Sequence, residues 1–114
     1  MVSHSGLLTV MDRAARKAGA KLRRDFSEVQ HLQVSRKGPA DFVSKADQRA
    51  ERTLYDELLH ARPDWGFLLE EAGEIPGDPS KPRWIIDPLD GTSNFLHGLP
   101  HFAISIAVEE PLAN

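Results

Sequence analysis

A hydrophobic run that leads into two spaced aspartates constrains the fold of this chain more than any other feature. Residues 84–86 are Trp-Ile-Ile, which predicts a buried strand that delivers Asp87 to its carboxyl end. Pro88 favours an extended Asp87, so the strand is expected to end there. Asp90 follows three residues later, and Gly91 permits a tight turn. Two carboxylates are therefore expected at one end of a strand.

This arrangement suits the binding of a metal ion and a phosphate. Paired carboxylates prefer a hard cation such as Mg²⁺. Residues 92–94, Thr-Ser-Asn, can open a short helix, whose free backbone N–H groups suit a phosphate. Together these features indicate metal-assisted phosphoryl transfer or hydrolysis. The alternative is an Asp-rich turn in which Asp90 only caps the helix, since such turns are common.

A second pair of carboxylates favours the metal hypothesis. Glu70 and Glu71 follow a short apolar run at residues 67–69, which is typical of a buried strand. Neighbouring residues of a strand point to opposite faces, so only one of the two glutamates can be a ligand. The alternative is a solvated strand end.

Two helices are expected before these strands. Residues 5–27 predict an amphipathic helix, because apolar residues recur there at three- and four-residue steps. Residues 37–41 are expected to form a loop, and a second helix follows and stops at residues 62–64. Ser44 with Asp47 fits a capping box at its start.

The remaining segments complete an α+β pattern. Residues 31–34 alternate weakly and predict a strand, whereas residues 72–83 are rich in Gly and Pro and predict an exposed loop. Residues 102–108 predict a strand with one bulky and one small face. The expected fold class is α+β, with two amino-terminal helices packed on a mainly antiparallel sheet.

Composition excludes several functions. Lys and Arg number 14 against 17 Asp and Glu, a net charge of −3, which argues against nucleic-acid binding. The chain has no cysteine, which excludes disulfides and thiolate chemistry. It shows neither the form of a signal peptide nor the roughly 20 apolar residues of a membrane span. A cytoplasmic protein with no membrane partner is expected.

Residues 87–95, Asp-Pro-Leu-Asp-Gly-Thr-Ser-Asn-Phe, resemble the signature of the inositol monophosphatase family of Mg²⁺-dependent, lithium-sensitive phosphatases. The resemblance extends to residues 38–47, to the Glu-Glu pair and to residues 97–109. It implies that residues 1–114 are the amino-terminal domain of this fold, truncated before a carboxyl-terminal domain. That absent domain carries a Trp-Asp element whose Asp binds the second metal.

The resemblance assigns the metal ligands. Glu70 would bind a metal and help to orient the attacking water, and Asp87 would bridge two metals. The carbonyl of Leu89 would bind one metal and Asp90 the other. The implied cofactor is Mg²⁺.

The resemblance also assigns the groups around the phosphate. Gly91 and Thr92 would donate backbone hydrogen bonds to it. The hydroxyl of Thr92, paired with Asp47, would polarise the water, and Lys37 would lie near the entrance. The competing role for Asp47 is the capping box alone.

The implied reaction is Mg²⁺-dependent hydrolysis of a phosphate monoester, with myo-inositol monophosphate as the default substrate. Histidinol phosphate, fructose 1,6-bisphosphate and adenosine 3′,5′-bisphosphate stay open, because residues of the absent half would choose among them. Two further alternatives are a catalytically incompetent fragment and a non-enzymatic interaction domain. The family is often dimeric, so the full-length enzyme is compatible with a homodimer.

Overall fold

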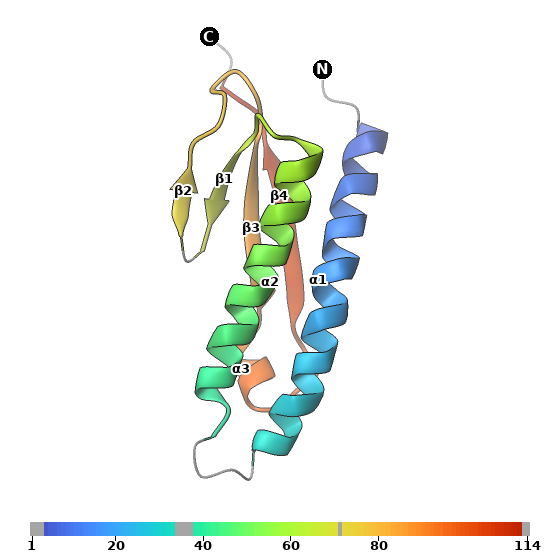
Figure 1. The fold of residues 1–114 in the computed structure, drawn as a ribbon, viewed down its shortest axis with the longest axis vertical. Helices are drawn as coiled ribbons and strands as arrows, with labels where there is room; N and C mark the ends of the chain where they lie inside the picture. The colour runs from blue at the N-terminus through green and yellow to red at the C-terminus, as the bar shows by residue number, and fades with distance from the viewer. Residues whose placement is uncertain (1–3, 34–37, 71, 113–114) are drawn as a thin grey trace.

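The computed structural model describes residues 4–33, 38–70 and 72–112. Two long helices lie side by side along one face of a four-stranded sheet, and both ends of the described chain lie at the same end of the molecule (Figure 1). The elements in chain order are α1 (His4–Leu32), α2 (Ala40–Ala61), β1 (Gly66–Leu69), β2 (Gly73–Ile75), β3 (Arg83–Asp90), α3 (Thr92–Leu96) and β4 (Ala103–Glu109). The predicted α+β layering of helices on a sheet is confirmed.

The sheet is mixed, with the strand order β2-β1-β3-β4. β1 pairs antiparallel with β2, and β3 pairs antiparallel with β4. β1 and β3 pair parallel, with Leu69 opposite Ile86. Because the carboxyl ends of parallel neighbours meet at the same edge, the residues that follow this pair, Glu70 and Asp87, emerge side by side.

The helix pair is held in a fixed antiparallel register. Three polar contacts join it at four-residue steps: Lys17 with Glu57, Lys21 with Thr53, and Asp25 with Arg49. The hydrogen bond from Lys17 is the main reason that the pKa of Glu57 lies below its usual value. Since α2 carries Asp47, the register also decides where that side chain stands along the sheet.

Two hydrophobic clusters fill the space between helices and sheet. The larger one contains the side chains of Trp84 and Phe67, which are 0% and 1% exposed, and the rings of Trp65 and Trp84 lie 4.9 Å apart. The smaller cluster surrounds Phe95, which is 0% exposed. Its other buried members are Leu22, Val29, Val43, Ala46, Ala50 and Leu89. This second cluster lies directly beneath the turn that ends β3.

The strand predicted for residues 31–34 is wrong in its described part. His31 and Leu32 belong to α1, which is longer than the predicted helix over residues 5–27. The reason is burial: Val29 is 0% exposed and prolongs the apolar stripe of α1 into the second cluster. Val34 lies outside the described residues.

The capping box predicted from Ser44 and Asp47 is also wrong. α2 already begins at Ala40, with Pro39 in the N-cap position and no side-chain cap. The predicted loop therefore ends before Ala40, and Ser44 lies within the helix. Asp47 stands on the inward face of α2 and is 8% exposed. A fixed φ suits proline to a helix start, which explains the early start.

Two strand boundaries differ from prediction. Residues 73–75, predicted as loop, form β2, because Gly73 adopts φ 75° and lets the chain turn back onto β1. β3 does not end at Asp87 but continues to Asp90, with a register shift between the two. At this irregularity the ladder is already broken, so the missing N–H of Pro88 costs little. The strand predicted for residues 102–108 is confirmed as β4.

Leu54→Ala should lower the free energy of unfolding by about 2–5 kcal/mol, because Leu54 is 0% exposed and its loss leaves a cavity. Leu8→Ala is the matched control, since Leu8 is 65% exposed and its truncation should shift stability by no more than about 0.5 kcal/mol. Urea unfolding of both variants measures the difference. Equal midpoints would contradict the assignment of Leu54 to the core.

Candidate metal and phosphate site

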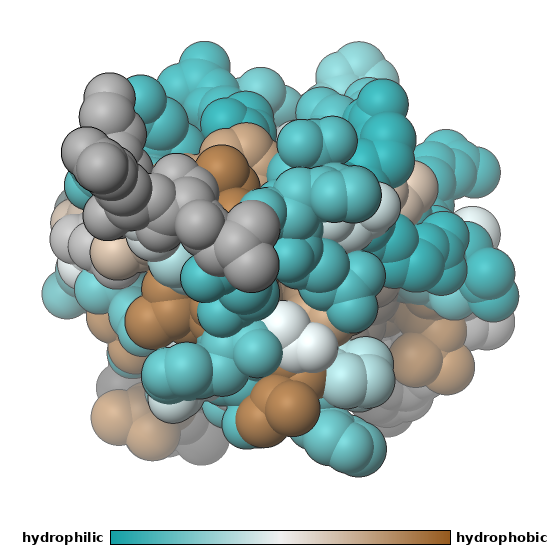
Figure 2. All heavy atoms as spheres, turned by 90° about the horizontal axis from the view of Figure 1, so that it is seen from below, coloured by the Kyte–Doolittle hydropathy of each residue, from teal (hydrophilic) through white to brown (hydrophobic). Residues whose placement is uncertain are grey.

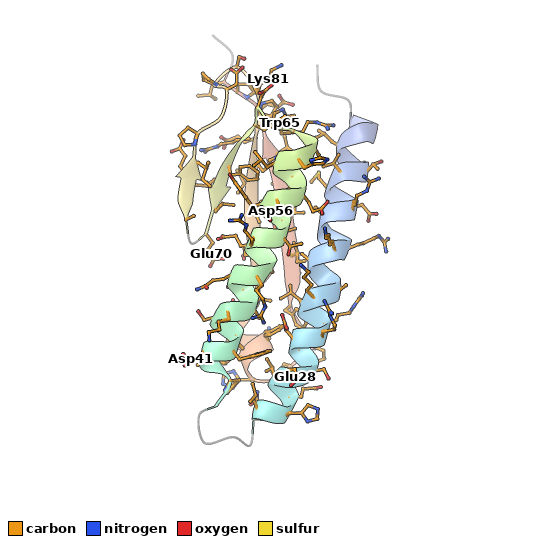
Figure 3. All side chains as sticks on the ribbon, in the orientation of Figure 1. Glu28, Asp41, Asp56, Trp65, Glu70 and Lys81 are labelled. Carbon is orange, nitrogen blue, oxygen red and sulfur yellow. The ribbon has the colours of Figure 1, made fainter. Side chains whose placement is uncertain are left out.

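The end of β1 and the middle of β3 place two acidic residues at neighbouring positions. Glu70 follows Leu69 and Asp87 follows Ile86, and these two strand residues are register partners. Figure 3 labels Glu70 at the end of β1, between Trp65 and Lys81 near one end of the molecule and Asp41 and Glu28 near the other. A cavity of about 340 Å³ lies beside it, lined by residues of α2 and by Leu69 and Ala72. Glu71, the second member of the predicted pair, lies outside the described residues.

The last residues of β3, from Asp87 to Asp90, form an irregular, internally bonded strand end that leads into the turn at Gly91. The backbone N–H of Leu89 donates to Oδ1 of Asp87 over 3.2 Å. The side chain of Leu89 is buried at 1% exposure, while its carbonyl accepts a 2.8 Å hydrogen bond from the hydroxyl of Thr92. The predicted metal ligands Asp87, Leu89 and Asp90 and the predicted phosphate-binding Thr92 thus belong to one turn.

Gly91 lets this turn reverse into α3. Its φ is 86°, in the left-handed region, and a Cβ built on it would lie 2.7 Å from the carbonyl oxygen of His101. No other residue type fits this position without strain. α3 then runs over Thr92–Leu96, so the short helix predicted after Gly91 is confirmed.

Asp90 and Thr92 are exposed, whereas Asp87 is half-buried. Figure 2 views the molecule from the end that carries α3, and hydrophilic side chains cover most of that face with separate hydrophobic patches between them. Asp47 lies inside the helix layer, beside Ala46 and Ala50 of the second cluster. Lys37, predicted near the entrance, lies outside the described residues.

The donor set is of the kind that Mg²⁺ prefers, because carboxylates and a carbonyl are hard oxygen ligands. Within residues 4–33, 38–70 and 72–112, however, no group of three His, Cys, Asp or Glu side chains is placed so that it could hold a metal ion. The strand register brings Glu70 next to Asp87, and Asp90 follows on the same strand. The chemistry of the donors therefore fits the ion, while the full ligand set stays a prediction.

Two side chains that support the turn were not predicted from the sequence. Asn94 donates to the carbonyl of His101 over 2.8 Å, and Gln33 donates to the carbonyl of Leu96 over 2.7 Å. Asn94 lies within the signature and could have been found there. Gln33 is 63 residues from its partner, and no local pattern marks it.

A model of the inositol monophosphatase family matches residues 4–111. The chain belongs to this family. An inositol-1-monophosphatase of Rhizobium meliloti (strain 1021) is 62% identical over 108 residues, which are 95% of this chain and 41% of the relative. The Nus factor SuhB of Escherichia coli (strain K12) is 42% identical over 90% of this chain and 38% of that protein.

A solved structure of the extragenic suppressor protein SuhB from Bartonella henselae shares the fold, with a TM-score of 0.78 and 50% identity. The match covers 91% of this chain and 39% of that chain. The chain thus spans about two-fifths of the length of these relatives. In the part of the chain that the structure describes, no helix is long and apolar enough to cross a membrane.

Gly91→Ala should destabilise the chain more than Gly73→Ala does. Both glycines have positive φ, 86° and 75°, but a Cβ at Gly73 meets nothing within 4 Å. The strain of a left-handed alanine is therefore common to both variants and costs about 1–2 kcal/mol. The excess in Gly91→Ala measures the clash with the carbonyl of His101. Equal losses of unfolding free energy in urea would show that the backbone around His101 moves aside without a measurable energetic cost.

Proposed function

We propose that the protein to which this chain belongs hydrolyses a phosphate monoester in a Mg²⁺-dependent reaction, with myo-inositol monophosphate as substrate. The observation that carries the proposal is the turn over residues 87–92, which joins two aspartates, a buried leucine and a left-handed glycine to the start of α3. Membership of the family and a relative called inositol-1-monophosphatase at 62% identity support the same reaction.

Mg²⁺ would be held by the carboxylates of Glu70, Asp87 and Asp90 and by the carbonyl of Leu89. The chemistry that such an ion supplies is charge neutralisation at the phosphate and a more acidic water. The Leu89 carbonyl already accepts the hydroxyl of Thr92. A cation bound to the Leu89 carbonyl oxygen would weaken its hydrogen bond from Thr92, because both use the lone pairs of that oxygen. The hydroxyl of Thr92 could then donate to Asp47 or to a water instead.

The chain's own groups would place the reactants. Glu70 would accept a hydrogen bond from the attacking water and aim it along the line of the leaving oxygen. The backbone N–H groups of Gly91 and Thr92 would donate to the phosphate, since the first N–H groups of a helix have no partner within it. Asp47, on the inward face of α2, would hold the hydroxyl of Thr92. No covalent enzyme intermediate is needed in such a displacement.

The proposal also covers the domain organisation, cellular location, inhibition and assembly of the enzyme. Residues 1–114 would be the amino-terminal domain, and the partner of the site is a small phosphate monoester. We place the enzyme in the cytoplasm, expect inhibition by lithium as in the family, and allow for a homodimer of the full-length protein. Histidinol phosphate, fructose 1,6-bisphosphate and adenosine 3′,5′-bisphosphate are the substrates to compare with inositol phosphate by kcat/KM.

In the full-length protein, Asp90→Asn should lower Mg²⁺-dependent turnover of inositol monophosphate by more than about a hundredfold, because loss of one anionic ligand removes several kcal/mol of charge stabilisation. Asp56→Asn is the matched control, since Asp56 is an exposed residue of α2 that pairs only with Arg52 on the surface. Steady-state rates at saturating Mg²⁺ and substrate give the comparison. Wild-type turnover in Asp90→Asn would refute its role as a ligand.

Residues 1–114 alone should hydrolyse phosphate monoesters at a rate near background. The resemblance places one further carboxylate of the second metal in a carboxyl-terminal domain, and Mg²⁺ binds loosely to an incomplete set of ligands. The test is to compare the purified chain with the full-length protein in the same Mg²⁺ assay. Turnover of the isolated chain on the order of 10 s⁻¹, a typical enzymatic value, would show that these residues suffice.

A further inference from the structure

The far end of α3 is tied to the last turn of α1 by one side chain. Nε2 of Gln33 lies 2.7 Å from the carbonyl oxygen of Leu96 and 3.3 Å from that of Val29. Its amide therefore bridges the carboxyl-terminal carbonyls of both helices, which lack partners within their own helix. Gly98, which turns the chain after α3 with φ 73°, lies against the stems of Gln30 and Gln33.

The near end of α3 is tied to the start of β4. The carbonyl of His101 accepts the side-chain amide of Asn94 at 2.8 Å and also lies against Gly91. The N–H of Leu99 returns to the carbonyl of Asn94 over 2.8 Å. The bond from Asn94 to His101 ties α3 to β4, and the bond from Leu99 closes α3 onto the turn that follows it; neither ties the helix to α1.

An aromatic cluster supports α3 from below. The ring of Phe95 lies 5.5 Å from that of Phe26 on α1 and 4.7 Å from that of Phe102, measured between centroids. The edge-to-face geometry of both contacts is a favourable one for aromatic rings. These ring contacts hold the side chain of Phe95 in place. Rotation of α3 about that side chain is opposed mainly by the hydrogen bonds at the two ends of α3.

We propose that Gln33 is a positioning residue for the phosphate-binding turn of the site, an inference that rests on the function proposed above. A helix of five residues cannot hold its own shape in water, so contacts from outside must aim its N–H groups. Gln33 supplies the contact at the end opposite Gly91. Loss of its donor unties the last turn of α3 from α1 while the backbone bonds of the turn stay, and the tilt of the whole short helix then varies at the end that faces the phosphate. Small displacements of this kind lower the rate because the transition state is held by aimed donors.

The test compares three substitutions in the full-length protein. Gln33→Met keeps the length of the side chain and removes the donor, whereas Gln33→Lys keeps a donor that also suits a helix carboxyl terminus. Gln30→Met is the matched control, because Gln30 is an exposed residue one turn earlier on α1. Gln33 is itself exposed, so all three variants are expected to fold.

Two readouts separate positioning from general stability. In Gln33→Met, amide hydrogen exchange should accelerate at His97, Gly98 and Leu99, whose N–H groups close α3 and the turn after it. Its kcat should fall roughly fivefold, the equivalent of one neutral hydrogen bond of about 1 kcal/mol, with KM and the inhibition constant of inorganic phosphate rising less. Gln33→Lys and Gln30→Met should match the wild type in both.

The outcomes are distinguishable. Exchange at α3 that stays at the wild-type rate in Gln33→Met, or a kcat that stays within twofold, overturns the positioning role while the phosphatase itself stands. Equal defects in Gln33→Met and Gln33→Lys overturn it as well, because the donor is then not what matters. A wild-type protein that turns over none of the four phosphate monoesters instead overturns the proposed function, and the inference with it.

Discussion

The left-handed backbone at Gly91 is the constraint on which the rest of the site depends. A side chain there would meet the carbonyl of His101 at 2.7 Å, so β3 and the start of β4 approach each other only because this residue has none. Asp90, just before this reversal, is the last residue of β3, and Thr92, just after it, is the first residue of α3. A carboxylate and the first N–H groups of a helix thus lie within three residues of each other, which is the arrangement that the proposed site for a metal-bound phosphate uses.

The turn at Gly91 is also flanked by buried side chains of the second cluster. Leu89 is 1% exposed and Phe95 is 0% exposed, and both belong to the second cluster together with Ala46 and Ala50 of α2. The polar groups of the site therefore alternate along the chain with buried apolar ones. Asp47 is 8% exposed on the same helix, directly after Ala46 in the sequence. Precise placement of reacting groups depends on packed neighbours of this kind.

Elements with a strong local signal could be predicted from the sequence. The apolar run before Asp87 and the alternation over residues 102–108 became β3 and β4, and the stripe that begins at Leu7 became α1. The errors arose where tertiary contacts decide. Residues 31 and 32 are helical despite the weak alternation over residues 31–34, because Val29 packs into the second cluster. β2 forms within a predicted loop because it can pair with the edge of β1. The cluster partners of Val29 include residues far along the chain, where periodicity carries no information. β2 instead pairs with the strand just before it, with Leu69 opposite Gly73, and the Gly- and Pro-rich composition of the segment hid it.

The same distinction applies to the site. The local structure around Asp87, Leu89, Asp90, Gly91 and Thr92 could be predicted because it consists of one strand end, one tight turn and one helix start, while the roles of these residues stay predictions. Asp47 had a competing role in a capping box, which the start of α2 at Ala40 excludes, while its role in catalysis stays a prediction. Gln33 had no signal at all, because its proposed role depends on a contact with Leu96, which lies 63 positions away in the sequence. The proposed chemistry therefore rests mainly on one short segment, whereas the proposed aim of its donors depends on Gln33, just after α1, which no motif contains.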